Sequence, residues 1–194
     1  MSTSPCHLRQ GKIGAALPAG PADGPTLRFA SYNIHAAVGT DGRRDLERIA
    51  AVIREIDPDV IALQEVDSRR ARGSLDQAQL IASALGMFCV EGPILEDGLG
   101  WYGNAILSKR PGFDVERWRY PKHSGEPRAA LGMRIADAGG RTWRVVATHL
   151  DLRFRARRHQ VDQLVQALAD GAPEPLALLA DVNDGGPGRR PGRV

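Results

Sequence analysis

The sequence contains little of what stabilises secreted or membrane proteins. Only two of its 194 residues are cysteines, Cys6 and Cys89, and they lie far apart. A structural disulfide is therefore not expected, and a reduced protein in the cytoplasm is the default interpretation. The leader, residues 1–25, contains no continuous apolar stretch, and nowhere does the chain approach the run of about eighteen apolar residues that a membrane helix needs. The sequence predicts neither a signal peptide nor a membrane span.

Aromatic residues and an excess of one charge are also scarce. Aromatics make up 5% of the chain, and 26 basic residues against 23 acidic ones leave a net charge of +3. A nucleic-acid-binding surface would have few side chains for stacking on bases, and core packing is the more ordinary role for the candidates. These candidates are Trp101, Tyr102, Trp118 and Tyr120. With 42% hydrophobic residues, the chain fits one globular domain with a substantial core, and we expect a monomer.

Basic residues are concentrated in the second half of the chain, with few acidic residues between them. They are Lys109, Arg110, Arg117, Arg119, Lys122, Arg128, Arg134, Arg141, Arg144, Arg153, Arg155, Arg157 and Arg158. A solvated face and a phosphate-facing surface explain this cluster equally well. Anionic partners are thus allowed by the sequence without being identified by it.

Hydrophobic periodicity predicts alternating strands and helices from residue 27 onward. Residues 27–33 form a strand pattern, and residues 45–56 have helical spacing, with Asp45 as N-cap and Pro58 as the stop. The short apolar run 60–63 is typical of a strand that is covered on both faces. The expected order strand, helix, strand is a crossover unit.

The remaining pattern predicts one more helix, a series of strands, a third helix and a last strand. The helices are expected at 74–85, stopped by Gly86, and at 155–169. The strands are expected at 87–90, 103–108, 113–118, 129–135, 142–148 and 176–181. Two stacked mixed sheets with helices outside them would accommodate both the buried and the alternating strands. The segments 1–26 and 185–194 are predicted to be disordered tails around one domain, 27–184.

Polar side chains follow four of the apolar strand runs. Asn33, Glu65, His149 and Asp181 each come at or just after the end of such a run, which predicts one polar site at a shared rim. Glu65 is a candidate ligand for a hard divalent ion such as Mg²⁺, and Asn33 could supply a neutral oxygen to the same ion. Each residue alone has an ordinary alternative, namely a solvated strand end for Glu65 and a turn former for Asn33.

Four candidates, of which Asn183 and Arg128 are new, point to phosphate chemistry. Asp181 and Asn183 stand two residues apart on an extended segment, so one could orient a water while the other contacts a phosphate oxygen. His149 could stabilise charge on phosphorus, and Arg128 could clamp a phosphate with its planar guanidinium. The alternatives are an Asx turn for the Asp-x-Asn pair, a satisfied core histidine and a solvated arginine.

The order of these motifs along the chain resembles the endonuclease/exonuclease/phosphatase superfamily. The segments that carry the resemblance are Tyr32-Asn-Ile-His35, Asp59-Val-Ile-Ala-Leu-Gln-Glu65, Gly103-Asn-Ala-Ile-Leu-Ser108, Ala147-Thr-His-Leu150 and Asp181-x-Asn183, together with Pro127-Arg128. The resemblance covers about residues 27–184. It implies a four-layer α/β/β/α sandwich and hydrolysis of a phosphoester, with Mg²⁺ as the usual ion and Mn²⁺ as a second candidate.

The resemblance also implies individual roles. Asn33 and Glu65 would approach the metal, and Asn104 and Arg128 would contact substrate or support the site. His149 would stabilise the transition state, Asp181 would position the water and Asn183 would bind phosphate. The metal would polarise the phosphoryl oxygen and activate the attacking water.

The chain departs from the family pattern in two places. Ala180-Asp-Val-Asn183 stands where members usually have Gly-Asp-Phe-Asn, and no Ser-Asp-His segment follows Asp184. The sequence is therefore expected to be a truncated form of a longer enzyme, with an incomplete sandwich and very weak turnover.

Three hypotheses about function remain open. The first is a metal-dependent phosphoesterase acting on nucleic acid, a lipid headgroup or a small phosphorylated metabolite, with a phosphodiesterase or nuclease preferred because of the basic cluster. The second is a catalytically silent domain that binds anions or a protein partner. The third is an unrelated domain in which the polar strand ends coincide by chance.

Overall fold

The structure, a computed structural model, describes residues 26–69, 76–121, 125–169 and 174–184. The predicted tails lie outside these residues, except for Thr26. In the part of the chain that is described, no helix is both long enough and apolar enough to cross a membrane.

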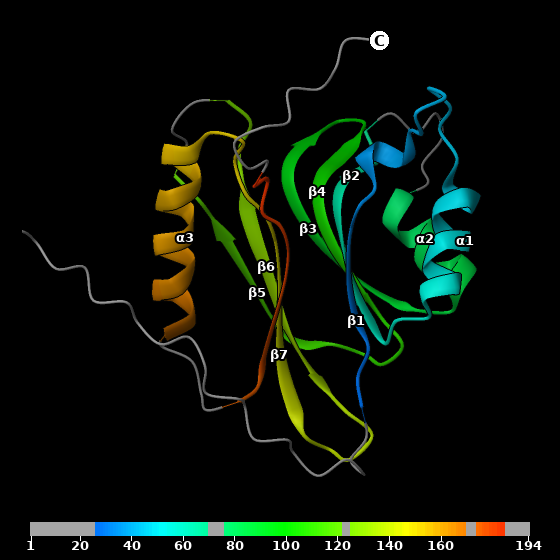
Figure 1. The fold of residues 1–194 in the computed structure, drawn as a ribbon. Helices are drawn as coiled ribbons and strands as arrows, with labels where there is room; N and C mark the ends of the chain where they lie inside the picture. Colours follow the sequence, from blue (N-terminus) through cyan, green and yellow to red (C-terminus); the bar gives the residue numbers. More distant parts are fainter. Residues whose placement is uncertain (1–25, 70–75, 122–124, 170–173, 185–194) are drawn as a thin grey trace, which may run out of the picture.

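Two four-stranded sheets are stacked face to face, with helices on the outer side of each (Figure 1). The first sheet has the order β1-β2-β4-β3 and comprises β1 (Phe29–Asn33), β2 (Val60–Asp67), β4 (Gly100–Ser108) and β3 (Phe88–Asp97). The second has the order β5-β6-β7-β8 and comprises β5 (Phe113–Arg119), β6 (Ala129–Ala136), β7 (Thr142–His149) and β8 (Leu176–Asp181). The predicted layers, helix on sheet on sheet on helix, are confirmed.

Helix α1 (Leu46–Ile56) begins and ends where the sequence predicts. The Asp45 side chain accepts a hydrogen bond from the Arg48 N–H, and Asp57 adopts a left-handed conformation just before Pro58. Helix α2 (Gln77–Leu85) starts later than the predicted residue 74, because the Asp76 carboxylate caps the N–H groups of Ala78 and Gln79. The segment 70–75 lies outside the described residues.

The core between the sheets is built from alternating strand residues. On β2, Val60 and Ala62 face the second sheet, whereas Ile61 and Leu63 face α1 and α2. All four are fully buried, which confirms the prediction of a strand covered on both faces.

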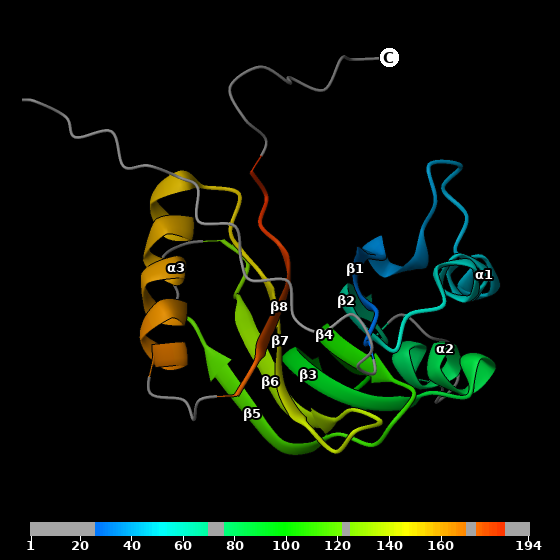
Figure 2. The same cartoon turned by 60° about the horizontal axis from the view of Figure 1, so that its bottom comes forward.

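The helical cover differs between the two sheets. Figure 2 shows α1 and α2 lying together over the first sheet, while α3 (Phe154–Ala169) covers the second alone. Helix α3 buries Ala156, Gln160 and Leu164 and leaves Phe154 and Val165 largely exposed. The outer face of the second sheet is therefore covered by one helix, whereas that of the first is covered by two.

The strands of the first sheet run further than predicted. β3 and β4 form one long hairpin around residues 97–100, although the sequence predicted only 87–90 and 103–108 as strands. Pro93 and the glycines at 92, 98, 100 and 103 favour a loop by local preference. A register shift between Pro93 and Leu95 accommodates the proline, so the pairing continues.

Three strands each bring one polar residue to the same rim. β1 pairs with β2 and β7 pairs with β8 in parallel, and Asn33, His149 and Asp181 are the last residues of β1, β7 and β8. Glu65 differs from the prediction, because β2 continues past it to Asp67. It lies at a register shift between Leu63 and Val66 and has a left-handed backbone, φ 55°.

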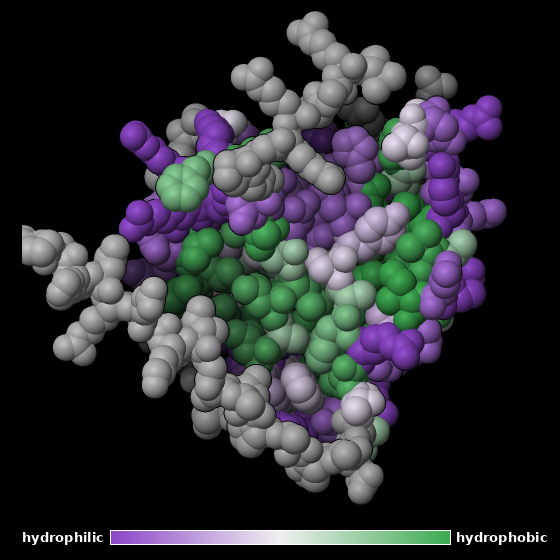
Figure 3. All heavy atoms as spheres, in the orientation of Figure 1, coloured by the Kyte–Doolittle hydropathy of each residue, from purple (hydrophilic) through white to green (hydrophobic). Residues whose placement is uncertain are grey.

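Figure 3 shows the result on one face of the molecule, where polar residues gather at the end at which β1 and β8 stop, above an apolar region. The exposed apolar side chains of β8, Leu176 and Leu178, are 44% and 46% accessible.

Candidate active site

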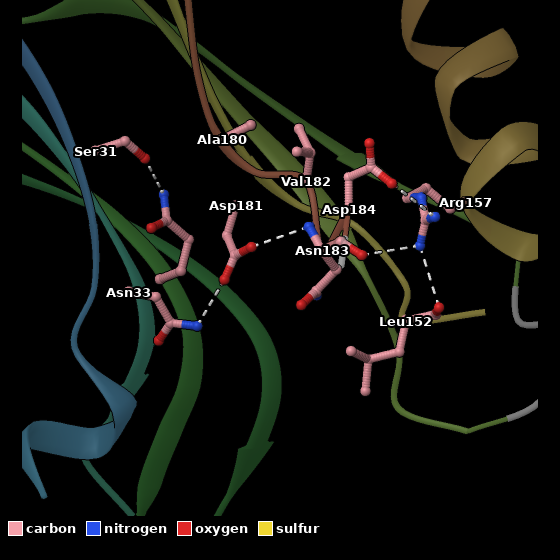
Figure 4. Close-up of a pocket in the computed structure, with 10 residues that line it drawn as sticks. Ser31, Asn33, Leu152, Arg157, Ala180, Asp181, Val182, Asn183 and Asp184 are labelled. Carbon is pink, nitrogen blue, oxygen red and sulfur yellow. Dashed lines mark hydrogen bonds and ion pairs between the residues drawn. The ribbon is translucent and has the colours of Figure 1, made fainter. Parts of the chain in front are cut away.

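Asn33 connects the two sheets through its amide nitrogen. Nδ2 donates to Glu65 Oε1 over 2.8 Å and to Asp181 Oδ2 over 2.9 Å, and Figure 4 shows Asn33 and Asp181 pointing toward each other. Its Oδ1 accepts a hydrogen bond from the His35 backbone N–H over 3.0 Å. Asn33 thus orients both carboxylates in this arrangement. The predicted role as an oxygen ligand would need the amide to turn over.

Glu65 occupies the centre of the polar rim. Its side chain is 22% exposed, and Oε2 lies 3.0 Å from Nδ1 of His35. The bulge in β2 supplies the left-handed backbone that turns Glu65 out of the strand alternation. Bulges redirect side chains in this way beside functional sites.

His149 is buried between a cation and two carboxylates. Arg128 Nη1 lies 3.0 Å from Nδ1, and Nε2 lies 3.6 Å from Asp181 Oδ2 and 3.9 Å from Glu65 Oε1. Because a guanidinium can only donate, Nδ1 accepts, and the proton of the neutral ring is on Nε2, facing the carboxylates. Burial lowers the pKa of His149, and Arg128 lowers it further against the pull of Asp181 and Glu65. The imidazole is therefore held in its neutral form.

Arg128 is itself buried, with 8% of its surface exposed. Its Nη2 forms an ion pair with Glu126 Oε2 at 3.2 Å, and its Nε has no hydrogen-bond partner among the described residues. A buried guanidinium with spare donor capacity beside a histidine is suited to receive an anionic oxygen.

Asp181 and Asn183 form the Asx turn that was the ordinary alternative, and they also reach the site. The Asn183 N–H donates to Asp181 Oδ1 over 3.0 Å, while Oδ2 remains directed at Asn33. Burial alone would raise the pKa of Asp181, but the hydrogen bonds from Asn33 and Asn183, with the charge of Arg128, outweigh it and lower the pKa. Asp181 is thus an ionised carboxylate at neutral pH.

The side chain of Asn183 approaches His149 from the side opposite Arg128. Its Nδ2 lies 2.9 Å from His149 Nε2 and 2.8 Å from the carbonyl oxygen of Leu150. Asn183 Nδ2 donates to the Leu150 carbonyl oxygen, and exchanging the two amide atoms would set Oδ1 against that oxygen, so Asn183 does not accept the Nε2 proton. His149 is therefore held by Arg128 at Nδ1, while its Nε2 faces Asn183 and the two carboxylates.

Asn104 lies apart from this network. It is 1% exposed, and its amide nitrogen donates to the Ala129 carbonyl oxygen over 3.2 Å, which links β4 to β6. Among the described residues, no hydrogen bond joins it to the other six predicted site residues. In the structure it ties the two sheets together just where the site is built.

Two residues with no predicted role lie at the site. His35 contacts Glu65, as described above, and Arg157 of α3 donates to the carbonyl oxygens of Leu152 and Asn183 over 3.1 Å each. The Tyr32-to-His35 motif contained a signal for His35, because it places a ring two residues after Asn33. Nothing in the sequence distinguished Arg157 from the other arginines of the basic cluster.

A cleft of about 690 Å³ opens beside Asp181, between β1 and β8. Its walls are Ser31, Asn33, Gln64, Leu152, Arg157, Ala180, Asp181, Val182, Asn183 and Asp184. Figure 4 shows Arg157 close to Asp184, Asn183 and Leu152 at the α3 side of the cleft. An anionic group of moderate size would therefore meet a cation on one wall and the carboxylate site on the other.

The arginines of the basic cluster have two different environments in the fold. Arg134 pairs with Glu174 at 2.9 Å and Arg144 with Glu116 at 2.8 Å, so these two are used within the second sheet. Of these arginines and the two others that were singled out, Arg128 and Arg157 lie at the site, whereas Arg134 and Arg144 do not. The cluster is thus partly structural and partly directed at the site.

The site suits a divalent ion that is held by few protein ligands. Among the described residues, no three Asp, Glu, His or Cys side chains form a compact metal-binding group. Mg²⁺ commonly uses one or two carboxylates and completes its shell with water and substrate phosphate oxygens. Glu65, which is partly exposed and is contacted by Asn33 and His35, fits this mode of binding.

Comparison with known proteins agrees with the geometry. The model of the Endonuclease/Exonuclease/phosphatase family matches residues 30–193. The crystal structure of an endonuclease/exonuclease/phosphatase from Beutenbergia cavernae superposes on 81% of the chain with a TM-score of 0.63 and 28% identity. The human Nocturnin catalytic domain with bound sulfate and a humanized D. rerio TDP2 also each superpose on 81% of the chain, at 21% and 19% identity and TM-scores of 0.61 and 0.64. At these identities the last two show a shared fold.

The chain is shorter than these structures. It covers 47% of the Beutenbergia chain, 64% of the Nocturnin domain and 62% of TDP2. The comparison with curated proteins gave no match.

Proposed function

This chain belongs to the endonuclease/exonuclease/phosphatase family, and from that premise we propose that it hydrolyses a phosphoester with the help of Mg²⁺ or Mn²⁺. A phosphodiester is the preferred substrate class. The observation that carries the proposal is the meeting of Glu65, His149 and Asp181, from three strands of two sheets, around one exposed point. A bound ion would supply charge for the phosphoryl oxygens and acidify a water molecule.

The role proposed for each residue follows from its protonation state. Asp181, ionised by its hydrogen bonds, is placed to orient a water and accept its proton. His149 directs its Nε2 proton at the same point and would donate it to a phosphoryl oxygen as negative charge grows there. Arg128 keeps this tautomer in place and adds a positive charge behind the ring. Glu65 would hold the ion.

The cleft and Arg157 on its wall would select the substrate. Arg157 lines the α3 wall of the cleft, where Asp184 pairs with it at 3.6 Å, and Arg128 lies against His149 outside the cleft lining. A diester with a flanking phosphate would use both, whereas a monoester would use one. TDP2 has been crystallised with a single-strand DNA product, which supports a nucleic-acid substrate for this chain as the first to test. Strong weakening of binding by added salt is expected for such a substrate.

The experiment is a comparison of bis-p-nitrophenyl phosphate and p-nitrophenyl phosphate as substrates, with Mg²⁺, with Mn²⁺ and with EDTA. We expect metal-dependent release of nitrophenol from the diester. Glu65→Gln should lower kcat/KM by about a hundredfold, the size of effect seen when one electrostatic group is removed from such a site. Glu55→Gln, an exposed change on α1, is the matched control and should leave the rate unchanged. Equal rates for Glu65→Gln and the parent protein would refute the proposal.

A second candidate is an anion-binding domain without turnover. Arg128 and His149 favour it, because this buried pair offers a phosphate site that does not depend on a metal. Binding of inorganic phosphate in EDTA, lost in Arg128→Met, with no hydrolysis of either ester under any metal condition, is the outcome expected from this candidate.

A further inference from the structure

His35 makes a contact with Glu65 that the proposed roles do not use. Its Nδ1 lies 3.0 Å from Glu65 Oε2, and its side chain is 77% exposed while that of Glu65 is 22% exposed. An exposed ion pair contributes little to stability on its own. The contact therefore stabilises the fold too little to explain why the backbone on both sides of it is fixed.

The backbone around His35 is held in an unfavourable conformation. His35, Ala36 and Ala37, the turn η1, have φ of 47°, 52° and 59°, three consecutive left-handed residues without a glycine. Such a conformation costs about 1–2 kcal/mol for each residue. Glu65, the partner of His35, also has positive φ.

Several hydrogen bonds enforce this turn. The Ile34 N–H donates to the Gln64 carbonyl oxygen over 3.0 Å, and the His35 N–H donates to Asn33 Oδ1 over 3.0 Å. The Ala36 carbonyl oxygen accepts from Gln77 Nε2 and Arg44 Nε over 3.0 and 3.1 Å. Strain that the surroundings over-determine in this way is typical of functional positions. His35 and Glu65 both have a strained backbone and face each other, which indicates a functional site rather than a chance contact.

The distance between the two atoms matches a shared ion. Two ligand atoms that each lie about 2.1 Å from an octahedral cation, at a right angle to each other, are about 3.0 Å apart. We propose that His35 Nδ1 and Glu65 Oε2 together bind the divalent cation, so that the site has one nitrogen and one oxygen ligand from the protein. The imidazole then keeps its proton on Nε2, and water and phosphate oxygens complete the shell. This inference rests on the proposed function and adds a metal ligand to it.

A nitrogen ligand changes which ion the site prefers. Mg²⁺ takes oxygen ligands almost exclusively, whereas Mn²⁺ and later first-row ions accept imidazole. His35 should therefore favour Mn²⁺ over Mg²⁺ compared with a site that offers oxygen ligands alone.

The test is the binding of each metal alone, by isothermal titration calorimetry, to the chain and to His35→Asn and His35→Asp. Asn and Asp tolerate left-handed φ better than most residues, so both variants should fold. His35→Asn should weaken Mn²⁺ binding about tenfold, as loss of one ligand contact does, with less than a twofold change for Mg²⁺. His35→Asp should bind Mg²⁺ at least as tightly as the parent protein. His159→Asn, which removes a histidine from α3, is the matched control and should change neither affinity.

Pulsed electron paramagnetic resonance of the Mn²⁺-loaded chain gives an independent measurement. Coupling to a coordinated ¹⁴N is expected in the parent protein and in His159→Asn, and it should disappear in His35→Asn. Equal Mn²⁺ affinity in the parent protein and His35→Asn, equal weakening for both metals, or no nitrogen coupling in the parent protein would overturn the inference. His35-dependent Mn²⁺ binding without hydrolysis would instead refute the proposed function and leave this site standing.

Discussion

The two sheets hold their parts of the site by different means. On the first sheet, His35 and Glu65 are positioned by backbone conformation, namely a left-handed turn and a bulge. On the second sheet, His149 and Asp181 end regular strands and are positioned by the side chains around them, Arg128 foremost. The proposed metal-binding side is thus held by its backbone conformation, and the proposed phosphate-binding side is held by polar contacts between side chains.

This difference has consequences for what each side tolerates. A strained backbone keeps its geometry when one side chain changes, because the turn is fixed by main-chain hydrogen bonds. A buried polar network loses several partners when one member is removed, and each unpaired group then costs free energy. We therefore expect substitutions on the second sheet to cost more stability than substitutions in the η1 turn.

The largest expected effect is that of Arg128→Met. The change leaves the buried His149 Nδ1 without its donor and the exposed Glu126 without its cationic partner, and it should lower the free energy of unfolding by about 2–3 kcal/mol, mostly through His149. Urea denaturation in EDTA measures it. The matched control is Arg119→Met at the exposed end of β5, which should cost less than about 0.5 kcal/mol. Equal losses for the two variants would show that the buried network contributes nothing special to the second sheet.

An intermediate effect is expected from pH. The pKa of folded His149 lies below its ordinary value of 6.5, so the unfolded chain binds the proton more readily. The stability contributed by neutral His149 is full above about pH 6.5 and falls as the pH drops toward the folded pKa, by at most about 1.4 kcal/mol per pH unit. Asp181, whose pKa is lowered, stays ionised in this window and adds no slope.

Urea denaturation between pH 5 and 7 in EDTA measures this slope, and His149→Gln should flatten it. A slope that survives in His149→Gln would assign the effect to another group and remove this support for a neutral imidazole.

The smallest effect should have the opposite sign. Ala36→Gly relieves left-handed strain at φ 52° and should raise the free energy of unfolding by about 0.5 kcal/mol, after the entropy cost of glycine is subtracted. The same substitution at Ala51, exposed in the middle of α1, is the matched control and should lower it by about 1 kcal/mol. Thermal or urea unfolding distinguishes the two signs. Destabilisation by both substitutions would mean that the turn is not under strain.

Much of the fold could be predicted because its signals are local. Asp45 and Pro58 bracket α1 by capping and by steric exclusion, and the apolar run at 60–63 needs burial on both faces. Asn33, His149 and Asp181 could be placed at one rim, since each ends a strand that has a parallel neighbour, and parallel strands end at the same edge of a sheet. These conclusions required only periodicity and strand ends.

The remaining features depend on pairing across the fold. The bulge at Glu65 exists because β4 pairs on both sides of a register shift, and no property of residues 63–66 alone requires it. The contacts of Asn104 and of Arg157 likewise follow from the neighbours that the sheets bring to them. The long β3–β4 hairpin was missed because the local preferences of Pro93 and four glycines oppose it.

The hydrogen bond between Asn33 and Asp181 joins residues that are 148 positions apart. Loops of this size close late, because the chain must lose much freedom before such a contact forms. Glu65 and His149 are synthesised before Asp181, so the arrangement proposed for these residues can form only once β8 has been made. The turn that carries His35 can form earlier, and any hydrolytic activity of the proposed site would begin only after β8 joins β7.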